Sequence, residues 1–231
     1  ISILVVDTID FKTRGRNLVD SVPTVLSLGT CDYAADLVDI ATSMIDPARL
    51  SASSPTDISW LTYTGGTTGQ QKGVILTQAN MAASCLISTA EWEWPEQISY
   101  LACSPISHAA GFLVTPTLLK GGTITLLPGF DPDRIIDLIE DGINTLFLVP
   151  TMIYALLDHP RIQDADLSNL ELLVYASAPM SPPRLRDALH LFGPVMMQCY
   201  GQTENIHLTM MRKSEHDFLK QERLLSCGRP P

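Results

Sequence analysis

The sequence is poor in the features that mark several large protein classes. Its cysteines are odd in number and show neither paired nor metal-like spacing, and its five histidines form no ligand cluster. This pattern argues against a disulfide scaffold and a zinc site, and it predicts a reducing compartment, the cytoplasm. The cysteines concerned are Cys31, Cys85, Cys103, Cys199 and Cys227.

Positive charge and long apolar runs are also scarce. Fifteen Lys and Arg residues stand against 25 Asp and Glu, a formal net charge of -10, which argues against binding along a nucleic-acid backbone. The most apolar stretch, 146–157, is shorter than a bilayer span and contains Pro150 and Thr151. With 45% hydrophobic residues, the chain is expected to form a globular protein with a large core.

What the sequence does contain is a stretch rich in glycine and threonine with one lysine, residues 61–74. Glycines permit positive φ and let several N–H groups point inward, threonines add hydroxyl donors, and Lys72 adds a positive charge. This combination predicts a loop that binds a polyphosphate, with a plain surface loop as the alternative. The residues expected to contact phosphate are Thr64, Gly65, Gly66, Thr67, Thr68, Gly69 and Lys72.

The spacing of this stretch differs from that of the two common phosphate loops. Gln71 precedes Lys72 and Gly73 follows it, whereas the nucleotide-triphosphatase loop needs Gly before the lysine and Ser or Thr after it. The glycines also lack the Gly-x-Gly-x-x-Gly spacing of a dinucleotide site. Both of those classes are therefore excluded.

Two further segments place small or polar residues where predicted strands end. The run Tyr200-Gly201-Gln202-Thr203-Glu204 follows an apolar strand expected over 195–200, and it presents a ring, a hydroxyl and a carboxylate together. Residues 175–180 join a strand expected over 170–175 to a helix that begins at Ser181-Pro182. A turn without any ligand is the alternative for the second segment, and a solvent-exposed loop for the first.

Short apolar stretches alternate with amphipathic ones along the chain, which predicts an α/β fold with mostly parallel sheets covered by helices on both faces. Pro95 interrupts the pattern, so we expect two subdomains, 1–95 and 96–231. The remaining strands are expected near 1–6, 23–28, 61–64, 99–103, 123–127 and 145–149, and the helices over 35–45, from Thr77, after His108, from Pro132 to a stop at Gly142, and over 150–157. The residues expected to be buried are Met81, Leu86 and Ala90 in the helix from Thr77, and Leu185, Ala188, Leu189 and Phe192 in the helix from Pro182.

Residues 63–74 resemble the Tyr-Thr-Ser-Gly-Thr-Thr-Gly-x-Pro-Lys-Gly-Val signature of the adenylate-forming enzymes, which include acyl-CoA synthetases, luciferases and the adenylation domains of peptide synthetases. Gly65 stands in place of the serine and Gln71 in place of the proline. Three other segments are similar to motifs of the same family. Residues 200–204 match Tyr-Gly-x-Thr-Glu, 177–179 resemble Gly-Ala-Pro, and 105–111 resemble Pro-Leu-x-His-x-x-Gly.

The resemblance implies a role for each matching residue. It places Ser177, Ala178, Pro179 and Tyr200 at adenine, Gly201 in the nucleotide-binding turn, Thr203 on the α-phosphate, Glu204 on Mg²⁺, and His108 at the acyl pocket near the reacting carboxylate. The catalytic residues it implies are Lys72, His108, Thr203 and Glu204.

The implied activity is the ATP-dependent conversion of a fatty or other apolar acid to an acyl-adenylate and then to a CoA thioester. Its small-molecule partners would be the acid, ATP and CoA, with Mg²⁺ as the metal. The resemblance is compatible with a homo-oligomer and with peripheral contact with a membrane surface. The alternatives are an acyl-AMP ligase, a peptide-synthetase type of adenylation domain, and an inactive nucleotide-binding module. The resemblance also implies that this chain is part of the large N-terminal domain, without the C-terminal domain, and inactive by itself.

Overall fold

The structure is a computed structural model of the chain that describes residues 2–46, 52–64, 72–217 and 219–231. It divides into two compact units, residues 1–52 and 53–231. The subdomain boundary expected near Pro95 concerns a different division of the chain, and it stays a prediction.

The first unit is a small parallel sheet with short helices. Its three strands are all parallel and follow the order β1-β2-β3. The helix expected over 35–45 is shorter than predicted, because Asp36 caps it by accepting the Val38 N–H and the helix ends at Ser43, which leaves Met44 and Ile45 exposed. The elements are β1 (Ile3–Asp7), α1 (Lys12–Leu18), η1 (Val19–Ser21), β2 (Thr24–Leu28), β3 (Ala35–Asp36) and α2 (Leu37–Ser43).

The second unit is built on a six-stranded sheet of order β11-β10-β9-β8-β6-β7. All neighbours in it are parallel except the β10–β11 pair, so the mostly parallel α/β fold is confirmed. Sequence reasoning did not predict β11, which returns along β10 as a hairpin. The strands are β6 (Ser99–Ala102), β7 (Thr123–Leu126), β8 (Thr145–Leu148), β9 (Leu172–Tyr175), β10 (Met196–Gln202) and β11 (Asn205–Met211).

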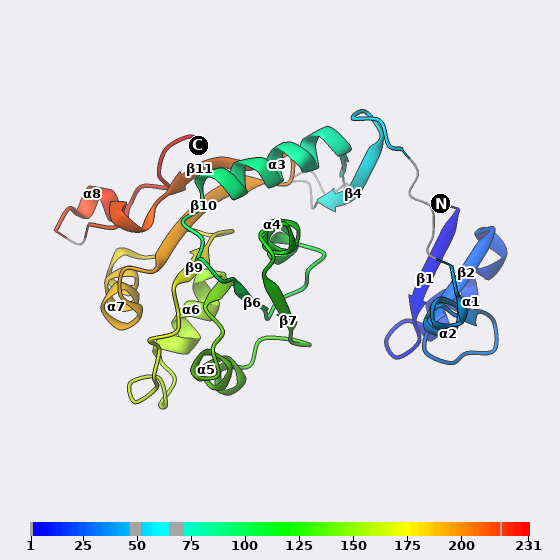
Figure 1. Ribbon diagram of the computed structural model, residues 1–231, viewed down its shortest axis with the longest axis horizontal. Helices are drawn as coiled ribbons and strands as arrows, with labels where there is room; N and C mark the ends of the chain where they lie inside the picture. Colours follow the sequence, from blue (N-terminus) through cyan, green and yellow to red (C-terminus); the bar gives the residue numbers. More distant parts are fainter. Residues whose placement is uncertain (1, 47–51, 65–71, 218) are drawn as a thin grey trace. The chain divides into compact units, whose positions relative to one another are not determined.

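Helices cover both faces of this sheet (Figure 1). One face packs on α5, α6 and α7 and forms the larger core cluster, while the other packs on the segment from α3 to Trp94 and on η2. These two layers leave the ends of the strands open, which is where parallel sheets bind ligands. The helices are α3 (Gln78–Glu91), η2 (Ala109–Leu113), α4 (Val114–Leu119), α5 (Pro132–Glu140), α6 (Pro150–Leu157), α7 (Pro182–Phe192), η3 (Lys213–Glu215) and α8 (Gln221–Leu224).

Prolines and caps set the starts of the helices on the larger core. Asp131 accepts the Arg134 N–H ahead of Pro132, and Gly142 follows the end of α5 at φ +106°. Ser181 occupies the cap position of α7, although its side chain makes no capping hydrogen bond. The four apolar residues predicted to be buried in α7 are all buried: Leu185, Ala188, Leu189 and Phe192.

Helix α3 begins as predicted but buries a different face. Thr77 and Asn80 form a reciprocal capping box at its start. Leu86 is 68% exposed and Ala90 is exposed, so those two expectations were wrong. Ser88 is buried instead, because its hydroxyl bonds to carbonyl groups of its own helix and so carries no unpaired polar atom inward.

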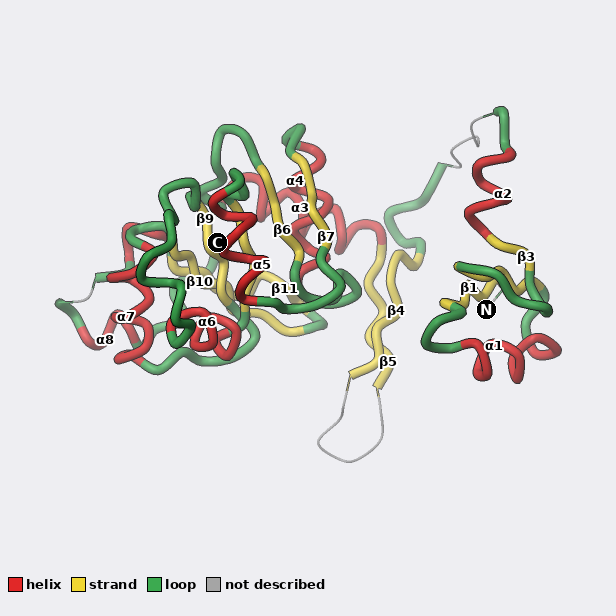
Figure 2. Tube along the Cα trace, turned by 90° about the horizontal axis from the view of Figure 1, so that it is seen from below, coloured by secondary structure: helices red, strands yellow, loops and turns green. Residues whose placement is uncertain are grey.

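A two-stranded antiparallel hairpin precedes α3 (Figure 2). It consists of β4 (Ile58–Thr64) and β5 (Lys72–Thr77), and Thr64 pairs directly with Lys72. None of the described helices is long and apolar enough to cross a membrane.

Candidate functional site

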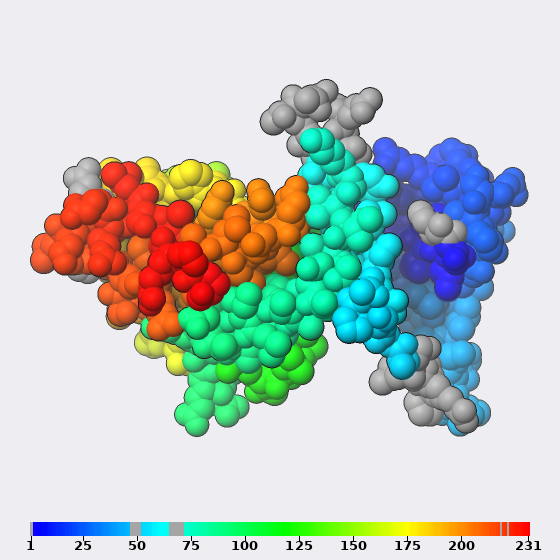
Figure 3. Space-filling view, turned by 90° about the horizontal axis from the view of Figure 1, so that it is seen from above, coloured from blue at the N-terminus to red at the C-terminus, as the bar shows by residue number. Residues whose placement is uncertain are grey.

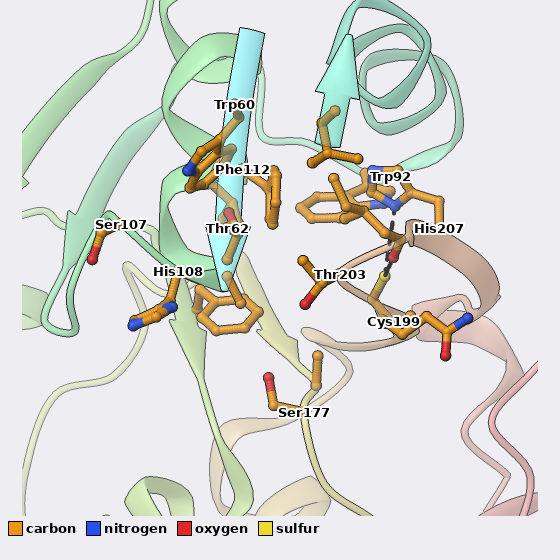
Figure 4. Close-up of a pocket in the computed structure, with 18 residues that line it drawn as sticks. Trp60, Thr62, Trp92, Ser107, His108, Phe112, Ser177, Cys199, Thr203 and His207 are labelled. Atoms are coloured by element: carbon orange, nitrogen blue, oxygen red, sulfur yellow. Dashed lines mark hydrogen bonds between the residues drawn. The ribbon is translucent and has the colours of Figure 1, made fainter. Parts of the chain in front are cut away.

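A cavity of about 340 Å³, which we call cavity one, lies between the β4–β5 hairpin, the end of α3, η2 and the β10–β11 turn. Figure 4 shows side chains from all of these elements converging on it. Aromatic rings make up much of its wall, and the Trp60 and Phe112 rings contact each other at 5.3 Å between centroids. The rings on the wall are those of Trp60, Trp92, Phe112, Phe147, His108 and His207.

A second cavity of about 330 Å³, cavity two, lies at the carboxyl ends of β9 and β10. Its wall includes every residue that the sequence predicts to contact adenine, together with apolar side chains of α8. Tyr200 is 48% exposed there, so one face of its ring is available for stacking. The predicted adenine residues are Ser177, Ala178, Pro179 and Tyr200, and Gly201 of the nucleotide-binding turn lines the cavity with them.

The two cavities adjoin. Ser177, Cys199 and Gly201 line both of them, and Thr203 lines cavity one beside them. A molecule in each cavity would therefore meet the other across one short stretch of backbone at the strand ends.

The backbone at this junction has two special positions. Ser177 has φ +72°, a left-handed conformation that costs a residue with a side chain about 1–2 kcal/mol. Gly201 packs so close to the Ile206 carbonyl oxygen across the β10–β11 turn that a Cβ would overlap it. Such constrained positions cluster at binding sites because the surrounding structure has to hold them there.

A fully paired polar network underlies cavity two. The Tyr175 hydroxyl lies 3.1 Å from His216 Nε2 and 3.3 Å from Gln198 Oε1, and His216 Nδ1 lies 2.8 Å from the Arg212 carbonyl oxygen. Burial raises the pKa of Tyr175 and lowers the pKa of His216. The neutral imidazole therefore donates from Nδ1 to the carbonyl and accepts from the tyrosine at Nε2.

The polar atoms beside cavity one are paired differently. His207 Nδ1 lies 3.6 Å from the Cys199 sulfur, whose thiol also donates to the Ile206 carbonyl oxygen at 3.8 Å, and Trp92 Nε1 has no hydrogen-bond partner among the described residues. Burial lowers the pKa of His207 to about 4, against the opposing effect of a hydrogen bond with the Ser84 backbone, and burial raises the pKa of the Cys199 thiol to about 12. Both groups are thus neutral at physiological pH.

The end of α3 and the segment after it are fastened to β11 by charged and ring contacts. Arg212 pairs with Glu91, the Lys213 N–H donates to Glu93 at 2.6 Å, and the Trp92 ring meets His207 edge-on. In Figure 3 the blue-green atoms of α3 lie beside the orange atoms of β11. These contacts hold the Trp92 and His207 wall of cavity one in place.

The predicted phosphate residues are described only in part. Thr64 and Lys72 stand opposite each other in the hairpin, and the Thr64 hydroxyl lies 3.5 Å from the Lys72 carbonyl oxygen. The Lys72 residue is exposed. The other predicted phosphate contacts, Gly65, Gly66, Thr67, Thr68 and Gly69, lie outside the described residues.

The predicted catalytic residues on the strand-end side are close to the cavities to different degrees. His108, at the start of η2, and Thr203, in the β10–β11 turn, both line cavity one. Glu204 follows Thr203 in the turn and is exposed. In the described parts of the chain, no three His, Cys, Asp or Glu residues come together as a metal site. A metal at Glu204 would therefore take its other ligands from phosphate and water.

Sequence reasoning missed the far wall of cavity one. Trp92 was considered only as part of the segment that ends α3, and His207 was not considered because β11 was not predicted. Cys199 carried a signal, since it directly precedes Tyr200 and so had to lie near the same strand end. No sequence pattern links Trp92 to His207.

Comparison with known proteins gives the family. The AMP-binding enzyme model matches residues 4–231. A medium/long-chain-fatty-acid–CoA ligase of Mycobacterium tuberculosis, FadD8, is 42% identical over 220 residues, which is 92% of this chain and 38% of that relative.

Two solved structures are also similar. The amide bond synthetase McbA from Marinactinospora thermotolerans has a TM-score of 0.86 at 32% identity, covering 99% of this chain and 46% of that one. ATP-bound MatB from Rhodopseudomonas palustris has a TM-score of 0.80 at 28% identity, covering 91% of this chain and 42% of that one. The chain thus spans less than half the length of these proteins, and it belongs to the family of AMP-binding enzymes.

Proposed function

We propose that the protein activates a carboxylic acid with ATP and then transfers the acyl group to coenzyme A. The observation that carries the proposal is the pair of adjoining cavities, one lined with rings and the other with the residues expected at adenine. An acid in cavity one and a nucleotide in cavity two would have their reactive ends side by side at Ser177 and Gly201. Proximity of this kind supplies much of the rate of a two-substrate reaction.

The chemistry assigned to the site has two steps. A carboxylate oxygen attacks the α-phosphorus of ATP, the bond from that phosphorus to the bridging oxygen breaks, and pyrophosphate leaves with the electron pair. The sulfur of CoA, having lost its proton, then attacks the acyl carbon, and AMP leaves. We assign Thr203 to the α-phosphate, His108 to the reacting carboxylate, and Thr64 and Lys72 to the departing pyrophosphate, where charge grows.

We assign Mg²⁺ to Glu204. The donor set fits, since a single exposed carboxylate beside Thr203 leaves most of the coordination sphere to phosphate and water oxygens, as Mg²⁺ prefers. When bound, the metal would neutralise charge on the phosphates. The chain's own contribution is to hold the carboxylate on a short hairpin turn.

The proposed acid is apolar over most of its length. Support comes from the aromatic wall of cavity one and from the name of the FadD8 relative, a medium/long-chain-fatty-acid–CoA ligase. We extend the proposal to a cytoplasmic location, supported by the five cysteines, which are all free thiols.

Acid-dependent exchange of labelled pyrophosphate into ATP, measured on the full-length gene product, tests the first step. Formation of an acyl-CoA thioester with release of AMP tests the second. Exchange without thioester would favour an acyl-AMP ligase, a peptide-synthetase type of adenylation domain or an amide-forming enzyme. Absence of exchange with fatty, aromatic and amino acids, while ATP still binds, would favour an inactive nucleotide-binding module.

A further inference from the structure

We propose that the Trp92 ring is the stop that limits the length of the acid that cavity one can hold. The substrate is then an apolar acid with an uncharged tail short enough to end at this ring. The inference rests on the proposed function, which places the acid in this cavity. It assigns a specificity-determining role to a residue that belongs to none of the motifs found in the sequence.

The place of Trp92 in cavity one is opposite the reacting end. Figure 4 shows Trp92 and His207 on one side of the cavity and His108 on the other. The carboxylate is assigned to the His108 side, so the tail of a bound acid extends toward Trp92. None of the described residues on the cavity wall is Asp, Glu, Lys or Arg, so the tail meets no charged side chain and is held by the burial of its carbon atoms.

A second ring supports Trp92 from behind. Trp92 is 6% exposed and belongs to the core cluster on this face of the sheet. Trp94, which is not part of the cavity wall, is stacked on it at 5.3 Å between centroids and 22° between planes. Trp94 is itself fixed, because its Nε1 donates to the Ser88 carbonyl oxygen at 2.8 Å. A tail that reaches Trp92 therefore meets two stacked rings.

Both neighbours of Trp92 in the chain are fastened to the residues that directly follow β11. Glu91 pairs with Arg212 at 2.5 Å, and Glu93 accepts the Lys213 N–H at 2.6 Å. These contacts hold the Trp92 backbone from both sides. A longer tail would have to break them, because a close-packed interior offers little space into which the ring could move.

A series of saturated straight-chain acids from butanoate to hexadecanoate measures the stop. Isothermal titration calorimetry on the full-length gene product, below the concentrations at which the acids form micelles, gives the dissociation constant of each acid. We expect binding to tighten by about fourfold for each added methylene, the effect of burying one CH₂, until the tail reaches Trp92. Beyond that length the affinity should stop rising or fall. An affinity that rises evenly through hexadecanoate overturns the inference.

Truncations of two rings on the cavity wall assign the stop. Trp92→Ala removes the ring at the far end, so the break in the series should move to acids about two or more carbons longer, and these should bind about tenfold more tightly than they bind the unmodified protein. Phe147→Leu shortens a ring that β8 contributes to the same wall, and it should leave the break at the same length. Should Trp92→Ala fail to fold, Trp92→Leu should move the break by a smaller step, and the series on the unmodified protein still decides.

The outcomes separate this inference from the proposed function. If none of the acids binds or supports pyrophosphate exchange, the assignment of an apolar acid to cavity one fails, and the inference fails with it. If exchange occurs and the break stays at the same length in Trp92→Ala, only the role of Trp92 is wrong. A break that moves equally in Trp92→Ala and Phe147→Leu also overturns the inference, because the wall as a whole would then set the length.

Discussion

Cavities one and two have nearly the same volume and share three residues, but their buried polar groups are arranged in opposite ways. Beneath cavity two, the Tyr175 hydroxyl and His216 are bonded to each other and to neighbouring groups. Beside cavity one, the Trp92 indole nitrogen has no hydrogen-bond partner among the described residues. A buried polar group that is fully paired holds a fold together, whereas one that is unpaired costs stability until a ligand completes it.

This contrast suggests that the two cavities have different binding roles. The paired floor of cavity two gives a fixed shape against which a flat base can stack. The wall of cavity one is rich in aromatic rings and suits an apolar molecule. The predictions below test this division, beginning with the change expected to have the largest effect.

Lys72→Ala tests whether the phosphate-binding residues can be changed without affecting binding in the two cavities. If Lys72 contacts the departing pyrophosphate, its loss should lower the rate constant of adenylate formation by about 10²–10³-fold, since the contact strengthens as charge develops. Acid affinity should stay the same because Lys72 lines neither cavity. Single-turnover kinetics on the full-length gene product give the rate constant, with the exposed Lys120→Ala as control. An unchanged rate would make Lys72 a surface residue.

The stability of the protein should fall with acid because of the buried imidazole at cavity one. Burial lowers the pKa of His207 in the folded protein to about 4 from its ordinary value of 6.5, so between these pH values the unfolded chain binds a proton that the folded chain does not. The free energy of unfolding is therefore unaffected by this group above pH 6.5. It decreases as the pH falls from 6.5 toward 4, by about 3 kcal/mol in total. His216, whose pKa is also lowered, adds a loss of the same sign.

Urea unfolding between pH 7 and pH 4 measures this loss. The variant His207→Gln should flatten the pH dependence, and the matched change His108→Gln at an exposed histidine should not. A slope that is the same in His207→Gln and the unmodified protein would show that His207 is protonated in the folded state.

Tyr175→Phe tests the paired floor of cavity two. The change removes the hydroxyl that donates to His216 Nε2 and leaves that nitrogen buried without a partner, so the free energy of unfolding should fall by about 1–3 kcal/mol. Chemical denaturation checks this, with Tyr63→Phe, at an exposed tyrosine, as control. A loss no greater than the control's would mean that the network contributes nothing to stability.

Glu204→Gln removes the charge of the carboxylate assigned to the metal and keeps its shape. The full-length gene product should then need about tenfold more Mg²⁺ for half-maximal pyrophosphate exchange, since Mg²⁺ prefers anionic oxygen. Folded stability should hardly change because Glu204 is exposed. Glu96→Gln, also exposed, is the control. A Mg²⁺ titration that overlays the unmodified protein would place the metal on the phosphates alone.

The smallest effect is expected at the junction of the cavities. Ser177→Gly relieves the positive φ but adds freedom to the unfolded chain, so the protein should gain only about 0.5 kcal/mol. Ser177→Ala keeps the strain and should leave stability nearly unchanged. Thermal unfolding of the two variants side by side separates the conformational effect from that of the hydroxyl. A loss of stability in Ser177→Gly would argue against strain at this position.

Local signals in the sequence predicted the parts of the fold that local chemistry decides. Asp131 with Pro132 marks the start of α5, and the apolar spacing of α7 identifies its buried face. The burial of α3 depends on tertiary partners, which is why exposed Leu86 was mispredicted. The strand β11 was missed because its polar residues, such as Asn205 and Thr209, hide the apolar alternation of a strand.

The candidate site divides in the same way. Residues of contiguous motifs, such as Tyr200 and Gly201, were identified from their order alone, and the structure places them on one cavity. The wall formed by Trp92 and His207 brings together residues far apart in sequence, and neither belongs to a recognisable motif. A wall built from such pairs leaves no local pattern to detect.

The fastening of the α3 region to β11 has a consequence for the order in which the molecule folds. Its contacts join residues 121 and 120 positions apart, Glu91 with Arg212 and Glu93 with Lys213. Contacts so distant in sequence form late, because the entropy of closing the intervening chain is lost before they contribute. On a ribosome, α3 emerges long before its partner strand, and Trp92 stays exposed until residues 205–213 have left the exit tunnel. Cavity one is then completed only after most of the sheet has formed, which makes a nascent chain with an open Trp92 a natural target for chaperones.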